Sequence, residues 1–300
     1  MKMGNKKVVF IVGPTAVGKT ALSIKLAKHF NTEIISCDSR QFYKELLIGT
    51  APPDKNELKK IKHHFIHNLS ITNNYNVGKF EADALLIIEE LHQKNDILIA
   101  VGGSGLYVDA ICKGFDKLPK ISSKNRENIN YNYNKLGLEW LQEEVQMIDP
   151  KFYENCEKNN PQRLLRALEV YKETGKTFSS FKTNKHKERP FEIIKIGLNI
   201  DREKLYSRIN KRVDKMINDG LLEEAISLEK HRNLNALQTV GYKEIFSFLN
   251  NETTLENAIE QIKQNTRRFA KRQLTWFRKN KNIKWFEPQE IEKIKTFIGL

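Results

Sequence analysis

Residues 13–20 read Gly-Pro-Thr-Ala-Val-Gly-Lys-Thr and stand between an apolar run, Lys7–Val12, and a helix-forming stretch that extends to about His29. The spacing Gly-x4-Gly-Lys-Thr after a strand and before a helix is that of a P-loop. Its glycines let backbone N–H groups converge on phosphate oxygens, and the helix N-terminus adds positive potential. The stretch predicts a diphosphate or triphosphate site with Thr20 as a Mg²⁺ ligand. The phosphate-binding residues are expected to be Gly13, Pro14, Thr15, Ala16, Val17, Gly18, Lys19 and Thr20.

Strand-like and helix-like segments alternate around this loop. The expected strands are Lys7–Val12, Glu33–Ser36, Asp96–Val101 and Phe191–Ile200, and Phe80–His92 has the apolar spacing of a helix. This alternation predicts an α/β fold, a P-loop NTPase-like parallel sheet with helices on both faces. Residues 116–190 contain no apolar strand and predict an inserted helical domain. Residues 1–115 and 191–300 would then form the α/β core, which is expected to be helical after residue 201.

The composition is that of a globular chain with an excess of positive charge. The 300 residues include 51 Lys and Arg against 37 Asp and Glu, a net charge of +14. Such a charge favours a polyanionic partner, because each neutralised phosphate releases counterions. No apolar segment reaches the roughly 20 residues that span a bilayer, and the first residues leave no room for a signal peptide. Three cysteines without CxxC spacing indicate neither disulfides nor a zinc site, so we expect a cytoplasmic protein.

Two polar segments follow expected strands, at the edge where an open α/β sheet binds its ligands. Asp38-Ser39-Arg40-Gln41 comes after the second strand, and Gly102-Gly103-Ser104-Gly105 comes after the third. P-loop kinases often place an acid near the acceptor at the first of these positions. The alternative for Asp38 is a helix cap or a solvated loop residue. The alternative for the glycine-rich segment is a simple tight turn.

Further motifs stand in order along the chain. They are Ile48-Gly-Thr-Ala-Pro-Pro, His63-His64, Val101-Gly-Gly-Ser-Gly-Leu-Tyr107, the run Pro161–Val170, Gly175-Lys-Thr177, Val240-Gly-Tyr242 and Arg272-Gln-Leu-Thr-Trp-Phe277. Together with the P-loop they resemble the bacterial tRNA dimethylallyltransferase family over almost the whole chain. The resemblance implies transfer of a dimethylallyl group from dimethylallyl diphosphate to N6 of an adenine in tRNA. That adenine lies immediately 3′ of the anticodon in tRNAs that read codons starting with U.

The resemblance also implies roles for single residues. Asp38 matches the general base, and Arg212 matches a diphosphate contact, with Arg208 one turn earlier as the alternative. Ser104 stands where the family usually has threonine and matches a hydroxyl placed against the target nucleotide. The segment Gln261–Lys284, with nine Lys or Arg and no acid, is either a phosphate-tracking surface or a solvated helix. Contacts to the tRNA anticodon stem-loop are implied for Asp38, Ser39, Arg40, Gln41, Ser104, Arg126, Gln162, Arg163, Leu164, Leu165, Arg166, Gln238, Thr239, Val240, Gly241, Tyr242 and Lys243.

Three other functions share some of these features. A small-molecule P-loop kinase would explain the loop, Asp38 and Mg²⁺, but not the basic insertion. Prenyl transfer to free AMP or ADP would leave the insertion and the basic C-terminal segment without a use. A non-enzymatic RNA-binding P-loop protein predicts that Asp38→Ala binds tRNA normally and changes no cellular phenotype. We expect a monomer whose partners are tRNA, dimethylallyl diphosphate and Mg²⁺, with no membrane partner.

Overall fold

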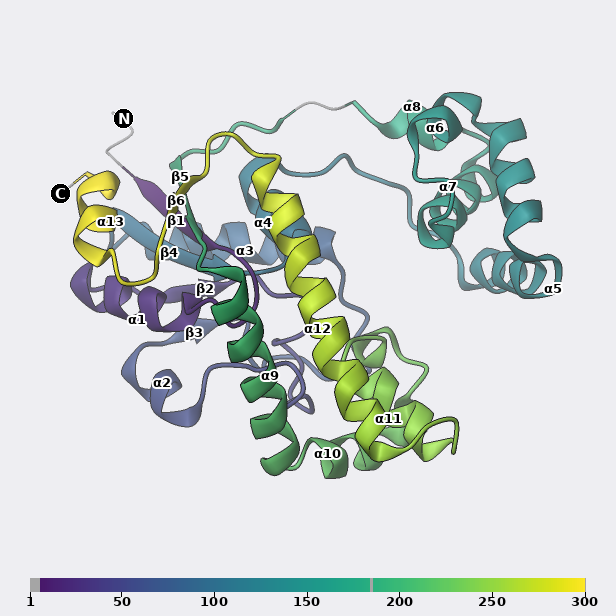
Figure 1. The fold of residues 1–300 in the computed structure, drawn as a ribbon. Helices are drawn as coiled ribbons and strands as arrows, with labels where there is room; N and C mark the ends of the chain where they lie inside the picture. Colours follow the sequence, from purple (N-terminus) through teal and green to yellow (C-terminus); the bar gives the residue numbers. More distant parts are fainter. Residues whose placement is uncertain (1–5, 184–185, 300) are drawn as a thin grey trace. The chain divides into compact units, whose positions relative to one another are not determined.

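The computed structural model describes residues 6–183 and 186–299 (Figure 1). A six-stranded sheet, built from the first and last parts of the chain, confirms the predicted α/β fold. The strand order is β3-β2-β4-β1-β5-β6, and every neighbouring pair is parallel. The strands are β1 Lys7–Val12, β2 Ile34–Ser36, β3 His63–His64, β4 Ile97–Gly102, β5 Glu192–Leu198 and β6 Lys284–Phe286.

The two edge strands differ from the sequence prediction. β3 was not expected, and β6 lies in the region expected to be helical, so the helical prediction is wrong for residues 284–286. Strands of two or three residues are too short to show an alternating pattern. They are defined by their neighbours instead, as the pairs Ile34 with His63 and Gly197 with Trp285 show.

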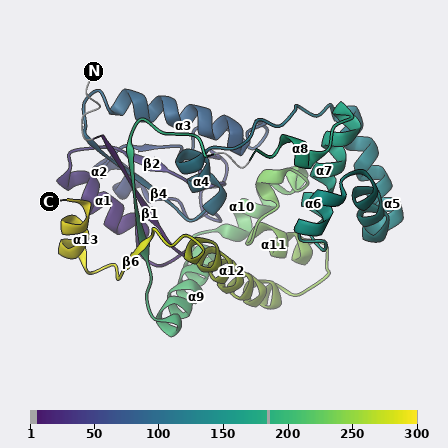
Figure 2. The same ribbon diagram turned by 90° about the horizontal axis from the view of Figure 1, so that it is seen from above.

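Helices cover both faces of the sheet (Figure 2). On one face, α1, α9 and α13 share a hydrophobic cluster with Val9 and Ile11 of β1, while α3 and α4 cover the opposite face. All residues from Val8 to Val12 are fully buried, as expected for a central parallel strand with both faces covered. The helices of this part are α1 Lys19–His29, α2 Lys55–Lys60, α3 Val77–Leu91, α4 Gly105–Lys113, α9 Arg202–Asn218, α10 Leu221–Ser227, α11 Tyr242–Leu249, α12 Leu255–Arg278 and α13 Ile291–Ile298.

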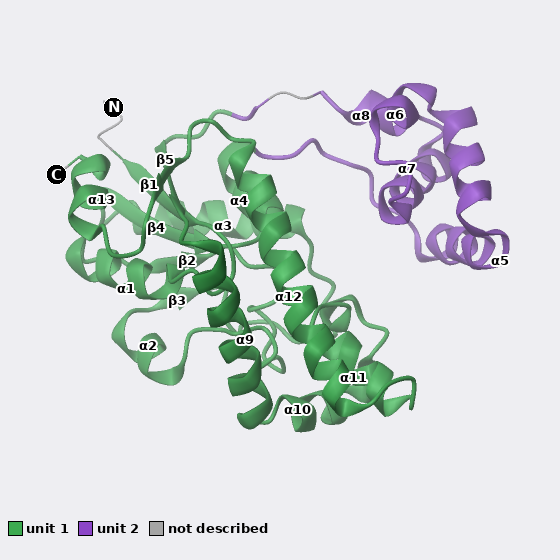
Figure 3. Cartoon of the chain, in the orientation of Figure 1, with its two compact units in different colours: residues 1–113, 188–300 green, residues 114–187 purple. Residues whose placement is uncertain are grey.

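The chain divides into two compact units (Figure 3). Unit 1 contains residues 1–113 and 188–300, and unit 2 contains residues 114–187, compared with the 116–190 expected from the sequence. The described residues of unit 2 form α5 Ser123–Ile148, α6 Pro150–Asn155, α7 Pro161–Thr174 and α8 Phe178–Phe181. These helices bury a core of their own that includes Leu141 and Leu168. None of the described helices has the length and apolar character that a bilayer span requires.

Candidate active site

Three strands of unit 1 end side by side, and a polar segment follows each of them. The register pairs Ser36 with Val101 and Val12 with Gly102, so β2, β4 and β1 end at one edge of the sheet. Asp38 follows β2, the P-loop follows β1, and the glycine-rich segment with Ser104 follows β4. The packing requires glycine at position 102, because a Cβ there would lie 2.2 Å from the Cys37 carbonyl oxygen. The candidate site is therefore the carboxyl edge of the sheet.

The P-loop has a backbone that favours glycine at two positions. Gly13 has a φ of 144° and Gly18 a φ of 111°, and a Cβ at Gly13 would lie 2.6 Å from the Leu198 carbonyl oxygen. Gly18 immediately precedes α1, so the loop ends at a helix N-terminus. Lys19 donates from Nζ to the Pro14 carbonyl oxygen at 2.7 Å, which folds its ammonium group back over the loop. Amides, helix N-terminus and ammonium together form an anion site.

Two arginines of α9 reach this loop from consecutive helical turns. Arg212 donates from Nη1 to Thr15 Oγ1 at 3.2 Å, and Arg208 donates from Nη1 to the Val17 carbonyl oxygen at 3.2 Å. Ala16, between the two contacts, has a φ of 64°. Burial lowers the pKa of the Arg212 guanidinium, but arginine stays charged in proteins. Both arginines therefore place positive charge beside the position of a bound diphosphate.

The ammonium group of Lys19 has an unusual pKa. Burial and the nearby charge of Arg212 lower the pKa of Lys19 to about 7, although the charge of Asp38 acts in the opposite direction. Lys19, Arg212 and Asp38 therefore share one electrostatic environment. A diphosphate bound in the loop would bring negative charge to the ammonium group and favour its protonated form.

We expect the lowered pKa of Lys19 to make diphosphate binding depend on pH. The affinity for an unreactive dimethylallyl diphosphate analogue should fall as the pH rises above about 7. Below that pH Lys19 is already protonated, whereas above it binding must include uptake of a proton, which lowers affinity by up to about tenfold per pH unit. Calorimetry in buffers of different ionisation enthalpy measures both the affinity and the proton uptake. Lys19→Met should bind weakly and lose this dependence; an unchanged pH dependence in the variant would contradict the assignment to Lys19.

A helix from a distant part of the sequence closes the site. Gln273 of α12 is buried, accepts from the Thr15 amide at 2.8 Å and donates to the Gly103 carbonyl oxygen at 2.9 Å. Trp276 packs against Gly105, where an added Cβ would lie 2.2 Å from the indole ring. The Gln273 amide thus joins the P-loop to the glycine-rich segment after β4. The motif that contains Gln273 is visible in the sequence, but this bridging role is not.

Asp38 lies in a turn that fixes its carboxylate. Oδ1 accepts from the backbone amides of Arg40 at 2.9 Å and Gln41 at 3.3 Å. Within residues 6–183 and 186–299, Oδ2 has no hydrogen-bond partner, so one oxygen orients the group and the other is available to a substrate. Ser104 is half-buried, and its carbonyl oxygen accepts from the Tyr107 amide at 3.0 Å at the start of α4.

The residues next to Asp38 are half-buried and held by other segments. Arg40 donates from Nη1 to the Ser39 carbonyl oxygen at 3.0 Å and from Nη2 to Asn235 Oδ1 at 3.2 Å. Gln41 donates from Nε2 to the Thr50 carbonyl oxygen at 3.2 Å. The turn after β2 is therefore linked both to the loop around residue 50 and to the segment that precedes α11.

A single carboxylate links Tyr242, in the predicted contact segment 238–243, to the loop at residues 47–49. Glu224 of α10 accepts from the amides of residues 47–49 at 2.8–2.9 Å and from the Tyr242 hydroxyl at 2.6 Å. Tyr242 is fully buried, and burial raises the pKa of its hydroxyl. Its side chain therefore packs in the protein interior and is not exposed to a ligand. Gln238 and Lys243 are exposed. No motif in the sequence marks Glu224, because one glutamate on an amphipathic helix does not reveal its partners.

In unit 2 the predicted contact segment 162–166 has two kinds of residue. Its first two residues are exposed, whereas its two leucines are buried in the core of the unit. Arg166 pairs with Glu169, and so does Arg126 of α5. The side chains that can reach a partner are therefore those of the polar residues, and the leucines hold α7 in place.

Known proteins resemble this chain in sequence. The profile of the IPP transferase family matches residues 41–280. The tRNA dimethylallyltransferase of Christiangramia forsetii is 57% identical over 283 residues, which cover 94% of this chain and 94% of the relative. The tRNA dimethylallyltransferase of Flavobacterium johnsoniae is 56% identical over 288 residues, with 94% and 93% covered.

Solved structures show the same fold along the chain. The tRNA isopentenylpyrophosphate transferase of Bacillus halodurans has a TM-score of 0.72 and 38% identity, with 98% of this chain and 95% of that chain covered. A eukaryotic dimethylallyltransferase acting on tRNA has a TM-score of 0.76 and 29% identity, with 97% and 76% covered. With sequence and fold in agreement, this chain belongs to the IPP transferase family.

Proposed function

We propose that this enzyme transfers a dimethylallyl group from dimethylallyl diphosphate to N6 of the adenine 3′ of the anticodon in tRNAs that read U-starting codons. The products are N6-isopentenyladenosine and diphosphate. One observation carries the proposal: a P-loop and an acid with one free carboxylate oxygen lie at the same sheet edge. The relatives that match almost the whole chain are named tRNA dimethylallyltransferases.

The reaction requires a base and a stabilised leaving group. Adenine N6 is a poor nucleophile because its lone pair is delocalised into the ring, so a base must take its proton as the N6–C1 bond forms. Oδ2 of Asp38 is that base. The C1–O bond of dimethylallyl diphosphate breaks, and its electron pair leaves with the diphosphate. The P-loop amides, Lys19 and Arg212 stabilise the negative charge where it develops.

The target adenine must leave the stack of the anticodon loop to reach Asp38. Extrusion costs least from a loop that is already single-stranded. The Ser104 hydroxyl, at the start of α4, would hold the extruded nucleotide. Residues 39–41 of unit 1 and its exposed residues Gln238 and Lys243, with Arg126 and the polar residues of 162–166 in unit 2, would contact the surrounding RNA.

Mg²⁺ fits the site through Thr20. Thr20 is the second residue of α1 and is half-buried, so its hydroxyl oxygen lies at the end of the P-loop. Mg²⁺ prefers oxygen ligands, keeps several waters and binds through one or two protein groups together with substrate phosphates. One hydroxyl is therefore a sufficient protein ligand. When bound, the ion would neutralise charge on the leaving diphosphate.

Replacement of Thr20 tests this magnesium site. Thr20→Val keeps the shape of the side chain but removes its oxygen, and should raise the Mg²⁺ concentration for half-maximal activity by about tenfold. Thr20→Ser restores the oxygen and should behave like the wild type. The measurement is a Mg²⁺ titration of activity at saturating tRNA. Identical titration curves for the valine and serine variants would show that Thr20 is not a ligand.

Mass analysis of tRNA nucleosides after incubation with the protein and dimethylallyl diphosphate tests the function. We expect N6-isopentenyladenosine in tRNA, and no prenylation when AMP or ADP replaces tRNA. Prenylated AMP or ADP would favour transfer to free nucleotides. Phosphoryl transfer from labelled ATP, without use of dimethylallyl diphosphate, would favour a kinase. The monomeric state and cytoplasmic location stay predictions.

A further inference from the structure

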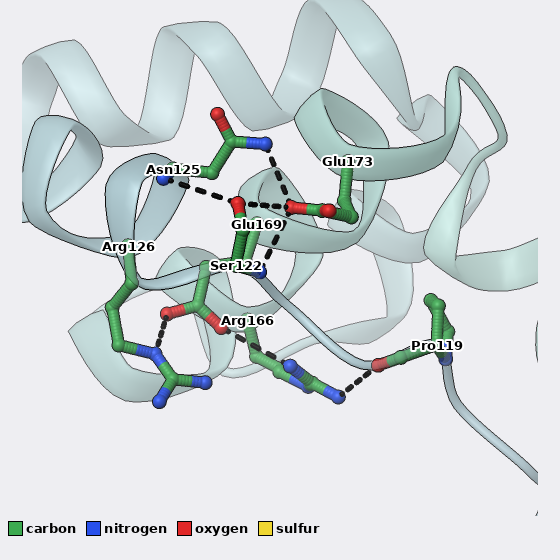
Figure 4. Close-up of polar contacts among 7 residues, drawn as sticks. All are labelled: Pro119, Ser122, Asn125, Arg126, Arg166, Glu169 and Glu173. Carbon is green, nitrogen blue, oxygen red and sulfur yellow. Dashed lines mark hydrogen bonds and ion pairs between the residues drawn. The ribbon is translucent and has the colours of Figure 1, made fainter.

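Glu169 of α7 contacts two arginines within unit 2 (Figure 4). Its side chain is only 10% exposed, and its two oxygens accept from Arg126 Nε at 3.1 Å and from Arg166 Nη1 at 3.2 Å. Arg166 also donates from Nη2 to the Pro119 carbonyl oxygen at 3.2 Å. Both Nη groups of Arg166 therefore contact groups of unit 2, and the contact with Pro119 braces the segment before α5.

Arg126 uses its guanidinium differently. Its contact with Glu169 is made through Nε, and its side chain is 51% exposed. Among the described residues the two Nη groups of Arg126 have no partner. A guanidinium held at Nε is restrained in rotation, while its Nη groups can still donate to the oxygens of one phosphate. Such restraint lowers the entropy lost on binding.

We propose that Glu169 is a positioning residue for RNA: it orients Arg126 so that the two Nη groups take a phosphate of the tRNA backbone. The proposal rests on the proposed function, because it assumes that tRNA is the substrate. A carboxylate beside an RNA-binding surface otherwise works against binding, since its negative charge repels phosphates. Its benefit in this place is the orientation that it gives to Arg126.

A second acid on the same helix has a different role. Glu173, one turn after Glu169, accepts from the Ser122 amide at 3.0 Å, the Ser122 hydroxyl at 2.9 Å and Asn125 Nδ2 at 2.7 Å (Figure 4). These contacts hold the start of α5 and include no arginine. Glu173 therefore stabilises the fold of unit 2, whereas Glu169 spans from α7 to an exposed cationic group.

Bulk charge and positioning of Arg126 predict opposite changes in tRNA affinity when Glu169 is replaced. Glu169→Gln makes the protein one charge more positive, so bulk attraction alone predicts equal or tighter tRNA binding. Positioning predicts that the dissociation constant for tRNA rises about five- to twentyfold, because glutamine has one carbonyl oxygen for two arginines. The slope of log affinity against log salt should fall by about one, as for one lost phosphate contact. The KM for dimethylallyl diphosphate should not change.

Matched variants separate positioning from charge and from folding. Glu154→Gln adds the same charge at an exposed residue of α6 and should bind tRNA as tightly as the wild type or more tightly. In an Arg126→Gln background, Glu169→Gln should have no further effect, because it acts through Arg126. If Glu169→Gln lowers the melting temperature of the full chain, Glu169→Asp replaces it. Aspartate keeps the charge but is too short to reach Nε, and should weaken binding in the same direction.

Two results would overturn the proposal. One is wild-type tRNA affinity in folded Glu169→Gln or Glu169→Asp, and the other is a full effect of Glu169→Gln in the Arg126→Gln background. Failure of the proposed function is a distinct outcome, since the wild-type protein would then leave tRNA unmodified. With an active wild type, the comparison of variants concerns Glu169 and Arg126 alone.

Discussion

Replacement of Asp38 by asparagine should lower the single-turnover rate of prenyl transfer by about 10²–10⁴-fold. Asparagine keeps an Oδ1 acceptor for the amides of Arg40 and Gln41, which lie at 2.9 and 3.3 Å. Its amide nitrogen, in the place of Oδ2, cannot take a proton from adenine N6. The loss of rate therefore reports the loss of the general base, because the turn that holds residue 38 is preserved. Rapid quench with enzyme in excess and saturating dimethylallyl diphosphate isolates the chemical step.

Binding of tRNA shows whether that loss is chemical. Asp38→Asn should bind tRNA with wild-type affinity, because the turn after β2 and the positive charge of Arg40 beside it are both retained. Asp38→Ala also removes the acceptor of the turn, so it should lose as much rate and unfold more easily, by about 1 kcal/mol. A single-turnover rate of Asp38→Asn close to the wild type would reject Asp38 as the base. Parallel losses of rate and affinity would assign it to binding instead.

Replacement of Arg212 by glutamine should lower kcat by about 10²–10³-fold, the usual loss when one preorganised donor to a developing charge is removed. The guanidinium lies 3.2 Å from the Thr15 hydroxyl, inside the phosphate loop. The leaving diphosphate gains charge in the transition state, so the arginine contributes more there than in the ground state. The KM for dimethylallyl diphosphate should rise less than kcat falls. Arg212→Lys should recover only part of the rate, because lysine lacks the forked donor.

Arg208 provides the matched comparison. It lies one helical turn before Arg212 and contacts the Val17 carbonyl oxygen at 3.2 Å, so its donor is directed at the backbone of the loop. Arg208→Gln should therefore lower kcat by about tenfold or less. Steady-state kinetics of both variants at saturating tRNA make the comparison. A larger loss for Arg208→Gln than for Arg212→Gln would exchange their roles.

The sheet edge that forms the candidate site could be predicted, because the positions of its residues depend on neighbouring residues in the sequence. Positive φ angles require glycine at Gly13 and Gly18, and a polar residue after a buried strand places Asp38 at the edge. Contacts between distant segments could not be predicted. Gln273 is 258 residues from the amide that it accepts from, and Glu224 is 177 residues from the first of its amide donors. Helical periodicity indicates which face of a helix is buried, but not which loop a polar side chain meets.

The segment 162–166 shows a different limit. The family resemblance implies RNA contact for all five residues, but the side chains of Leu164 and Leu165 are buried in the core of unit 2. A sequence motif can combine residues that pack in the core with residues that bind a partner, and the amino-acid sequence alone does not distinguish the two kinds. The charges around Glu169 carry no sequence signal either, because Arg126 is 43 residues away.

The position of β1 has a consequence for synthesis on the ribosome. β1 pairs with β4 on one side and with β5 on the other, but β5 begins at Glu192, after the whole of unit 2. A nascent chain that ends before that residue carries an apolar central strand with one open edge, while unit 2 already has the residues of its own core. We expect unit 2 to fold before the sheet closes, and the sheet to close slowly because its pairings are non-local. Chaperone binding to nascent chains should then be strongest before residue 192 emerges.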